Sequence, residues 1–186
     1  GTGAGGDRWA MVDAGADQVL DFTDCGLPST FGVEPSGVED VFIRLTNELA
    51  VAAVDVTVIE VADGVFQEET AALLRSPVFA RNVDVILFAA GDALGALAGV
   101  RHLKELDLPV IAVSGLLTAS PLAIREAAAA LGMPVIGAEE MNTGAWLPEI
   151  EPVKAGSGRH GLPAIRSARR TVGGLFEALQ VAGLKA

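Results

Sequence analysis

The sequence predicts an α/β fold, a three-layer sandwich in which a mostly parallel sheet of about five strands has helices on both faces. Apolar residues make up 51% of the 186-residue chain and charged residues 20%, a composition typical of a compact core. Runs rich in β-branched residues alternate with amphipathic helical segments. The connections between them are short, which predicts right-handed crossovers between parallel strands.

The first half of the chain is predicted to hold two strands and a helix. The segment "DQVLDFT" at residues 17–23 is the first strand, and a helix is expected at about residues 38–52. The run "VDVTVIEVA" at residues 54–62 is almost continuously β-branched or apolar. Such a run is expected for a strand that is buried on both faces.

Two strand–helix units and a short strand follow. Residues 83–91, "VDVILFAAG", and residues 108–115, "LPVIAVSG", are predicted strands. The second is followed by a helix with Ser120 as N-cap, Pro121 at the first position and Gly132 as C-terminal cap. Residues 134–138, "PVIGA", form a fourth strand of the series. The helix predicted at residues 92–106 carries one apolar stripe, made of Leu94, Leu97, Val100, Leu103 and Leu106.

Residues 1–186 are predicted to form a single α/β domain. Residues 150–163 are rich in Pro and Gly, and are expected to be a flexible linker before a last helix at about residues 164–182. Because the chain starts with Gly1 in place of Met, we expect it to be processed or to be part of a longer protein.

Charge and cysteine content restrict the partners. A net charge of −11 argues against nucleic acid and anionic membranes. No apolar run is long enough to cross a bilayer, because Asp55 and Glu60 interrupt the longest one. Cys25 is the only cysteine, which predicts a reducing, cytoplasmic location. Neither histidine is placed to serve it, since His102 is expected on the polar side of a helix and His160 in the linker.

The opening residues "GTGAGG" have the Gly-x-Gly-x-x-Gly spacing of dinucleotide-binding loops. Such a loop follows a strand, opens a helix, and is accompanied by an acid about 20 residues later. Asp21 and Asp24 satisfy that distance, and the interpretation requires a strand immediately before Gly1. An NAD(P)-binding Rossmann domain therefore stays open as one interpretation.

Four acidic residues follow the predicted strands: Asp24, Glu60, Asp63 and Asp92. Because ligands bind at the carboxyl ends of parallel strands, we expect these acids to converge on one edge of the sheet. Carboxylates beside backbone amides suit Mg²⁺ and a phosphate ester. Asp92 could instead cap a helix, and Asp63 could belong to a turn with Gly64. Glu60 is harder to explain structurally, because burying an unpartnered carboxylate in an apolar run is costly.

The runs "VDVTVIEVADG", "VDVILFAAGDALGALAGVRHLKELDLPVIAVSG" and "LAIREAAAALGMPVIGAEE" resemble the dethiobiotin synthetase-like group of P-loop NTPases. The resemblance covers most of residues 54–140. It implies a Mg²⁺- and ATP-dependent enzyme that activates a small carboxylate or amine by phosphoryl transfer. The chain departs from the group in lacking the G-x-x-x-x-G-K-[ST] loop, which would lie upstream of Gly1.

The resemblance also implies roles for individual residues. Glu60 would be the Walker-B-like acid, with Asp63 as a second catalytic carboxylate, and Glu60 and Asp24 would be the metal ligands. An anionic small-molecule substrate would be bound by Thr2, Gly3, Gly5, Gly6, Arg8 and Asp92. Arg8 could instead lie exposed on an ordinary helix, with Trp9 packed.

We also expect a homo-oligomer. A third interpretation is a non-catalytic ligand-binding or assembly module, in which the alanine-rich segment "REAAAALG" packs against another subunit.

Overall fold

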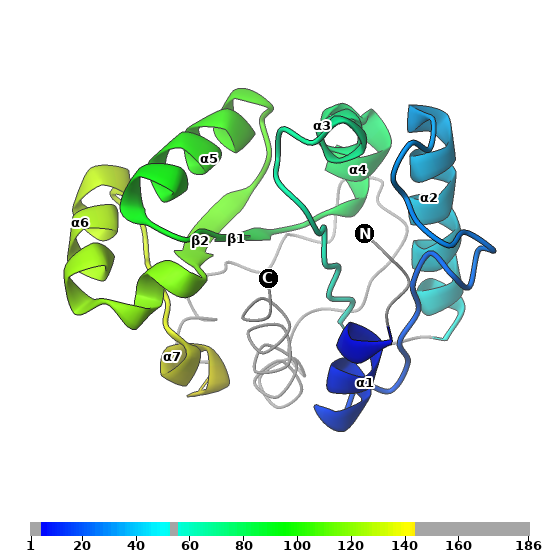
Figure 1. Ribbon diagram of the computed structural model, residues 1–186, viewed down its shortest axis with the longest axis horizontal. Coiled ribbons are helices and arrows are strands. Elements are labelled where there is room, and N and C mark those ends of the chain that lie inside the picture. The colour runs from blue at the N-terminus through cyan, green and yellow to red at the C-terminus, as the bar shows by residue number, and fades with distance from the viewer. Residues whose placement is uncertain (1–4, 53–55, 144–186) are drawn as a thin grey trace, which may run out of the picture.

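The computed structural model describes residues 5–52 and 56–143. Within these residues, helices surround two parallel strands (Figure 1). The elements are α1 (Gly6–Asp13), α2 (Pro35–Val51), α3 (Glu68–Arg75), α4 (Pro77–Asn82), β1 (Ile86–Ala89), α5 (Ala93–Glu105), β2 (Val110–Ser114), the 3₁₀ turn η1 (Leu116–Ala119), α6 (Pro121–Leu131) and α7 (Ala138–Thr143). The α/β character is therefore as predicted, whereas the predicted linker and last helix lie outside the described residues.

The two strands pair in parallel, and α5 is the crossover between them. Ile86 lies opposite Val110, and Ala89 lies opposite Ser114. The predicted strand at residues 134–138 contributes one parallel bridge, from Val135 to Val113.

Residues 17–23 and 56–62 do not form strands, so the described residues contain two strands of the five predicted. In the first segment the chain turns at Asp21, whose carbonyl accepts a hydrogen bond from the Asp24 N–H. Local bonds of this kind compete with strand pairing. In the second segment Ile59 is 38% exposed and Glu60 is exposed, so this run is not buried on both faces. A β-branched composition suits a strand but does not by itself supply a partner.

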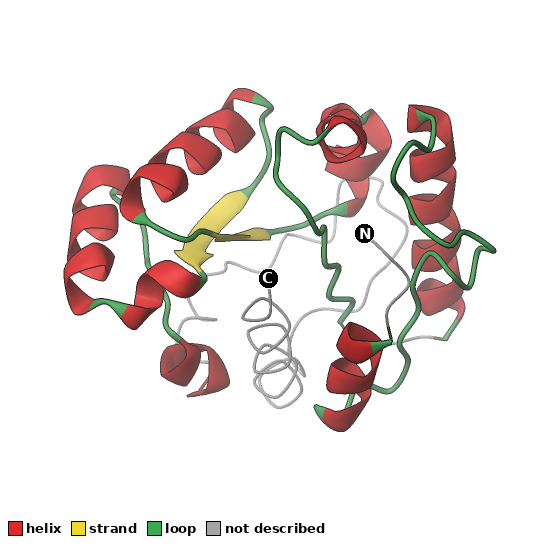
Figure 2. Ribbon diagram, in the orientation of Figure 1, coloured by secondary structure: helices red, strands yellow, loops and turns green. Residues whose placement is uncertain are grey.

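Successive residues of β2 point to opposite faces, and helices cover both of them (Figure 2). Val113 packs with α5 and α6 on one face, while Ala112 packs with Met141 of α7 on the other. A further core cluster joins α2, α3 and α4 to the end of α5, and consists of Phe42, Leu74, Phe79, Leu103 and Leu108.

The ends of α6 are formed as the sequence predicts. The Ser120 hydroxyl accepts a hydrogen bond from the Ala123 N–H at 3.3 Å, and Pro121 occupies the first turn. Gly132 ends the helix in the left-handed conformation with a φ of 63°. Both ends depend on residues within a few positions in sequence, which is why they could be predicted.

The buried stripe of α5 differs from the predicted one. Val100 and Leu103 are buried as predicted, but Leu94 is 76% exposed, and Ala96 and Gly99 complete the buried face. Gly99 faces the ring of Phe88 on β1. A Cβ atom at Gly99 would lie 2.2 Å from Cζ of that ring, so only glycine allows α5 to approach β1 this closely.

We expect Gly99→Ala to lower the free energy of unfolding by about 1–2 kcal/mol, because the cost of overpacking exceeds the gain in helix propensity. Gly95→Ala is the matched control on the same helix, since its Cβ would make ordinary contact with Asp92 Oδ1 at 3.4 Å. This control should be neutral or stabilising by up to about 1 kcal/mol. Urea unfolding of the two variants measures both values, and equal midpoints would contradict the close contact.

Candidate functional site

The start of α1 is the candidate site, because several of the predicted site residues meet there. Gly5 is the N-cap and Gly6 the first residue of α1, while Thr2 and Gly3 lie outside the described residues. Arg8 is the only Lys or Arg among the first 43 residues of the sequence, which include eight Asp and Glu residues. The electrostatics of this region therefore depend on one guanidinium group.

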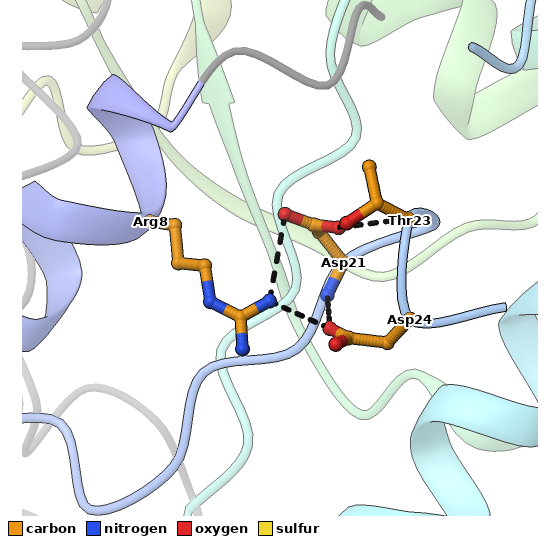
Figure 3. Close-up of polar contacts among 4 residues, drawn as sticks. All are labelled: Arg8, Asp21, Thr23 and Asp24. Atoms are coloured by element: carbon orange, nitrogen blue, oxygen red, sulfur yellow. Dashed lines mark hydrogen bonds and ion pairs between the residues drawn. The ribbon is translucent and has the colours of Figure 1, made fainter. Parts of the chain in front are cut away.

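Arg8 points from α1 towards the turn at residues 21–24 (Figure 3). Its Nη1 donates to Oδ2 of Asp24 at 2.8 Å and lies 3.9 Å from Oδ2 of Asp21. The same Asp24 oxygen accepts the Asp21 N–H at 2.9 Å, and Asp21 Oδ1 accepts the Thr23 N–H at 2.7 Å. The turn is thus closed by its own hydrogen bonds and presents two carboxylates to Arg8. We call Arg8, Asp21 and Asp24 the Arg8 cluster.

The cluster holds Asp24 in its ionised form. Hydrogen bonding from the Asp21 N–H is the main cause that lowers the pKa of Asp24, and Arg8 lowers it further. The side chains of Arg8 and Asp24 are 36% and 35% exposed, so water screens the ion pair. Pairs of this kind contribute less than about 1 kcal/mol. The contact therefore orients Arg8 more than it stabilises the fold.

Glu60 is a second acid whose electrostatics involve α1. Although the residue as a whole is exposed, burial of its carboxyl group raises its pKa, and the negative charge of Asp7 raises it further. Asp7 and Arg8 are neighbours on α1. The structure thus brings Arg8 together with Asp21 and Asp24, next to Gly5 and Gly6 at the start of α1, whereas Glu60 is related to α1 only through the charge of Asp7.

Asp92 is not part of this group. Its Oδ1 accepts the Gly95 N–H at 2.6 Å and so caps the N-terminus of α5, as the structural alternative predicted. Asp63 has a φ of 68°, and the carbonyl of the following Gly64 accepts the Gln67 N–H at 2.9 Å. Asp63 therefore belongs to a turn, as the structural alternative from the sequence predicted.

The predicted convergence of Asp63 and Asp92 on one edge is wrong. Val61 and Val65, which flank Asp63, pack against the core cluster that includes Leu103, in the last turns of α5. Asp92 caps the other end of this 13-residue helix, about 20 Å away. The expectation assumed that residues 54–62 run parallel to β1 in one sheet, and those of them that are described do not form a strand.

His102 is also placed differently from the prediction. Its ring lies against the exposed ring of Phe66, with centroids 5.0 Å apart, and its Nε2 is buried without a hydrogen-bond partner. His102 is thus half-buried, because Phe66 in the loop before α3 packs against it. The sequence pattern predicted this side of the helix to be polar.

Sequence reasoning missed Glu69. This buried carboxylate accepts the N–H of Gly32 and a side-chain N–H of Gln67, and the bond from Gly32 is the main cause that lowers its pKa. It ties the loop before α2 to α3. Its partner Gly32 is 37 residues away, so no local pattern could have identified the contact.

Within residues 5–52 and 56–143, no group of three or more His, Cys, Asp or Glu side chains could hold a metal ion. The free thiol of Cys25 is half-buried. In the same part of the chain, no helix is long and apolar enough to span a membrane.

Comparison of the chain with protein-family models, with curated proteins and with solved structures finds no match.

We expect Asp24→Asn to be destabilising at neutral pH by less than about 1 kcal/mol. Because folding lowers the pKa of Asp24, its contribution is present above the ordinary value of 3.8 and is lost as the pH falls through the folded value. Urea unfolding of both proteins from pH 7 to pH 2.5 measures the difference. A difference that grows on acidification would contradict the assigned hydrogen bonds.

Proposed function

We propose that this chain is part of a Mg²⁺- and ATP-dependent enzyme that activates a small carboxylate or amine by phosphoryl transfer. The observation that carries the proposal is the placement of Arg8 directly after a glycine-rich run, where it contacts Asp24. The charge of Asp7, in the same turn of α1, also acts on Glu60. We assign the anionic group of the substrate to this turn. Cytoplasmic location is part of the proposal, supported by the single cysteine.

Two features of α1 favour an anion. The N–H groups of the first helical turn have no partner within the helix, and the helix dipole places partial positive charge there. Arg8 uses Nη1 for both of the carboxylate contacts that it makes with Asp21 and Asp24, and we propose that Nη2 and Nε bind the ligand. Asp21 and Asp24 hold the guanidinium in place, so less side-chain entropy is lost on binding.

The same carboxylates would repel a bare anion, so we propose that the anion binds together with Mg²⁺. Mg²⁺ takes one or two protein carboxylates, retains several waters, and completes its shell with phosphate oxygens. Asp24 and Glu60 would supply the carboxylates, with Arg8 giving up part of its contact to Asp24. Bound Mg²⁺ would neutralise phosphate charge, while Asp63 and Asp92 are left outside this site.

We also propose that the sheet is larger than two strands, as the sandwich of about five strands requires. The bridge between Val113 and Val135 supports a third strand beside β2. A mostly parallel sheet with helices on both faces would match the three-layer arrangement of the group that the sequence resembles.

A Rossmann-type NAD(P) site is the second candidate. It is favoured by one observation, that the glycine-rich run opens a helix at Gly6. In that case Asp21 or Asp24 would bind the ribose hydroxyls, and Arg8 would have to leave the carboxylate that it contacts. Thermal melts with NAD⁺ and NADP⁺ separate the two candidates, since only the Rossmann site predicts stabilisation.

We expect Mg·ATP to shift the NMR signals of Gly5, Gly6 and Arg8 Nε, with weaker shifts from ATP in EDTA. Arg8→Ala should raise the dissociation constant about 10-fold or more, because a hydrogen bond to a charged group is lost. Arg44→Ala, at an exposed position on α2, is the matched control and should change nothing. Equal affinity of Arg8→Ala and the wild-type chain would contradict the proposed site.

A further inference from the structure

We propose that the exposed face of α1 docks into the groove between α5 and α6 of a second copy of this chain. The inference does not depend on the proposed function, because it uses Trp9, Val12 and Asp13, to which the proposed function assigns no role. It identifies the surfaces through which the chain would form a homodimer.

Against the described residues, α1 lacks the packing that a short helix requires. None of its eight residues is buried. Helices shorter than about 12 residues are marginal in water and are stabilised mainly by tertiary packing of an apolar face. Trp9 is 70% exposed and Val12 is 54% exposed, although the sequence alternative had Trp9 packed. These two residues are three positions apart and therefore lie on one face of the helix, with the exposed Asp13 beside them.

The groove between α5 and α6 offers a complementary surface. Its accessible apolar residues are Leu97 of α5 and Ala130 and Leu131 of α6, while Val100, which is only 2% exposed, lies beneath them. Its charged residues are Arg101, Lys104 and Glu105. The groove between the two helices has a volume of about 340 Å³. Two cations against one acid make this groove locally positive on a chain with a net charge of −11.

The two surfaces match in chemistry. An amphipathic helix binds a groove by inserting apolar residues spaced three or four apart, while charges at the rim fix its orientation. Trp9 and Val12 supply the apolar anchors, and Asp13 supplies the charge that Arg101 or Lys104 would meet. Tryptophan and arginine are the residues most often responsible for binding energy at interfaces.

A second copy is the occupant because α1 cannot reach its own groove. Figure 1 shows α1 at the opposite end of the molecule from α5 and α6. Two copies placed side by side in opposite directions would make the contact twice, which closes the assembly as a two-fold dimer.

Sedimentation equilibrium of the full 186-residue chain tests the proposal, and we expect a dimer. Trp9→Ala should raise the dimer dissociation constant at least about 30-fold. Leu122→Ala is the control, because this residue is 67% exposed on α6 but does not line the groove.

Arg101→Asp and Asp13→Arg should each weaken the dimer, and their combination should restore affinity. Circular dichroism confirms that each variant is folded.

Three results would overturn the proposal. The first is a chain that stays monomeric at its highest soluble concentration. The second is a dimer that neither Trp9→Ala nor Arg101→Asp weakens. The third is a monomer in which cross-linking joins Lys104 to Lys154 or Lys185 of the same copy, because the groove would then be covered by the chain's own C-terminal residues.

Discussion

The contact between Arg8 and Asp24 is the interaction on which the functional region depends. One guanidinium faces eight acidic residues in the first 43 positions, and it joins α1 to the turn at residues 21–24. Because the pair is partly exposed and screened by water, it orients the guanidinium beside Asp21 and Asp24 more than it stabilises a helix that has no buried residue.

Two glycines allow β1, α5 and β2 to pack closely against one another. Gly99 lets α5 pack directly on Phe88, and Gly115 brings the end of β2 against β1. Gly115 has a φ of 98°, and a Cβ there would lie 2.7 Å from the backbone nitrogen of Ala90. Ala90 donates to the Ser114 carbonyl and accepts from the Leu117 N–H. The parallel unit β1–α5–β2 is therefore closely packed, whereas α1 is attached mainly by polar contacts.

The sequence predicted best what depends on local chemistry. The caps at Ser120 and Gly132 need only residues within one helical turn, and β1 and β2 are short apolar runs. The cap at Asp92 is equally local, but it was the alternative to the predicted role in substrate binding. The sequence predicted poorly what depends on distant partners. The run at residues 54–62 has strand composition, but pairing requires a neighbour that the composition does not specify. The bond between Glu69 and Gly32, and the separation of Asp63 from Asp92, are likewise set by chain path.

The central claim is that Glu60 and Asp24 belong to one site at the start of α1, with Asp7 as the link to Glu60. The most direct measurement is the ¹³C NMR titration of the Glu60 carboxyl in the wild-type chain and in Asp7→Asn, with Asp13→Asn as the control at the far end of α1. We predict that the pKa of Glu60 is raised in the wild-type chain and falls towards its ordinary value of 4.5 in Asp7→Asn only. A Glu60 pKa that is the same in all three proteins would contradict the shared site.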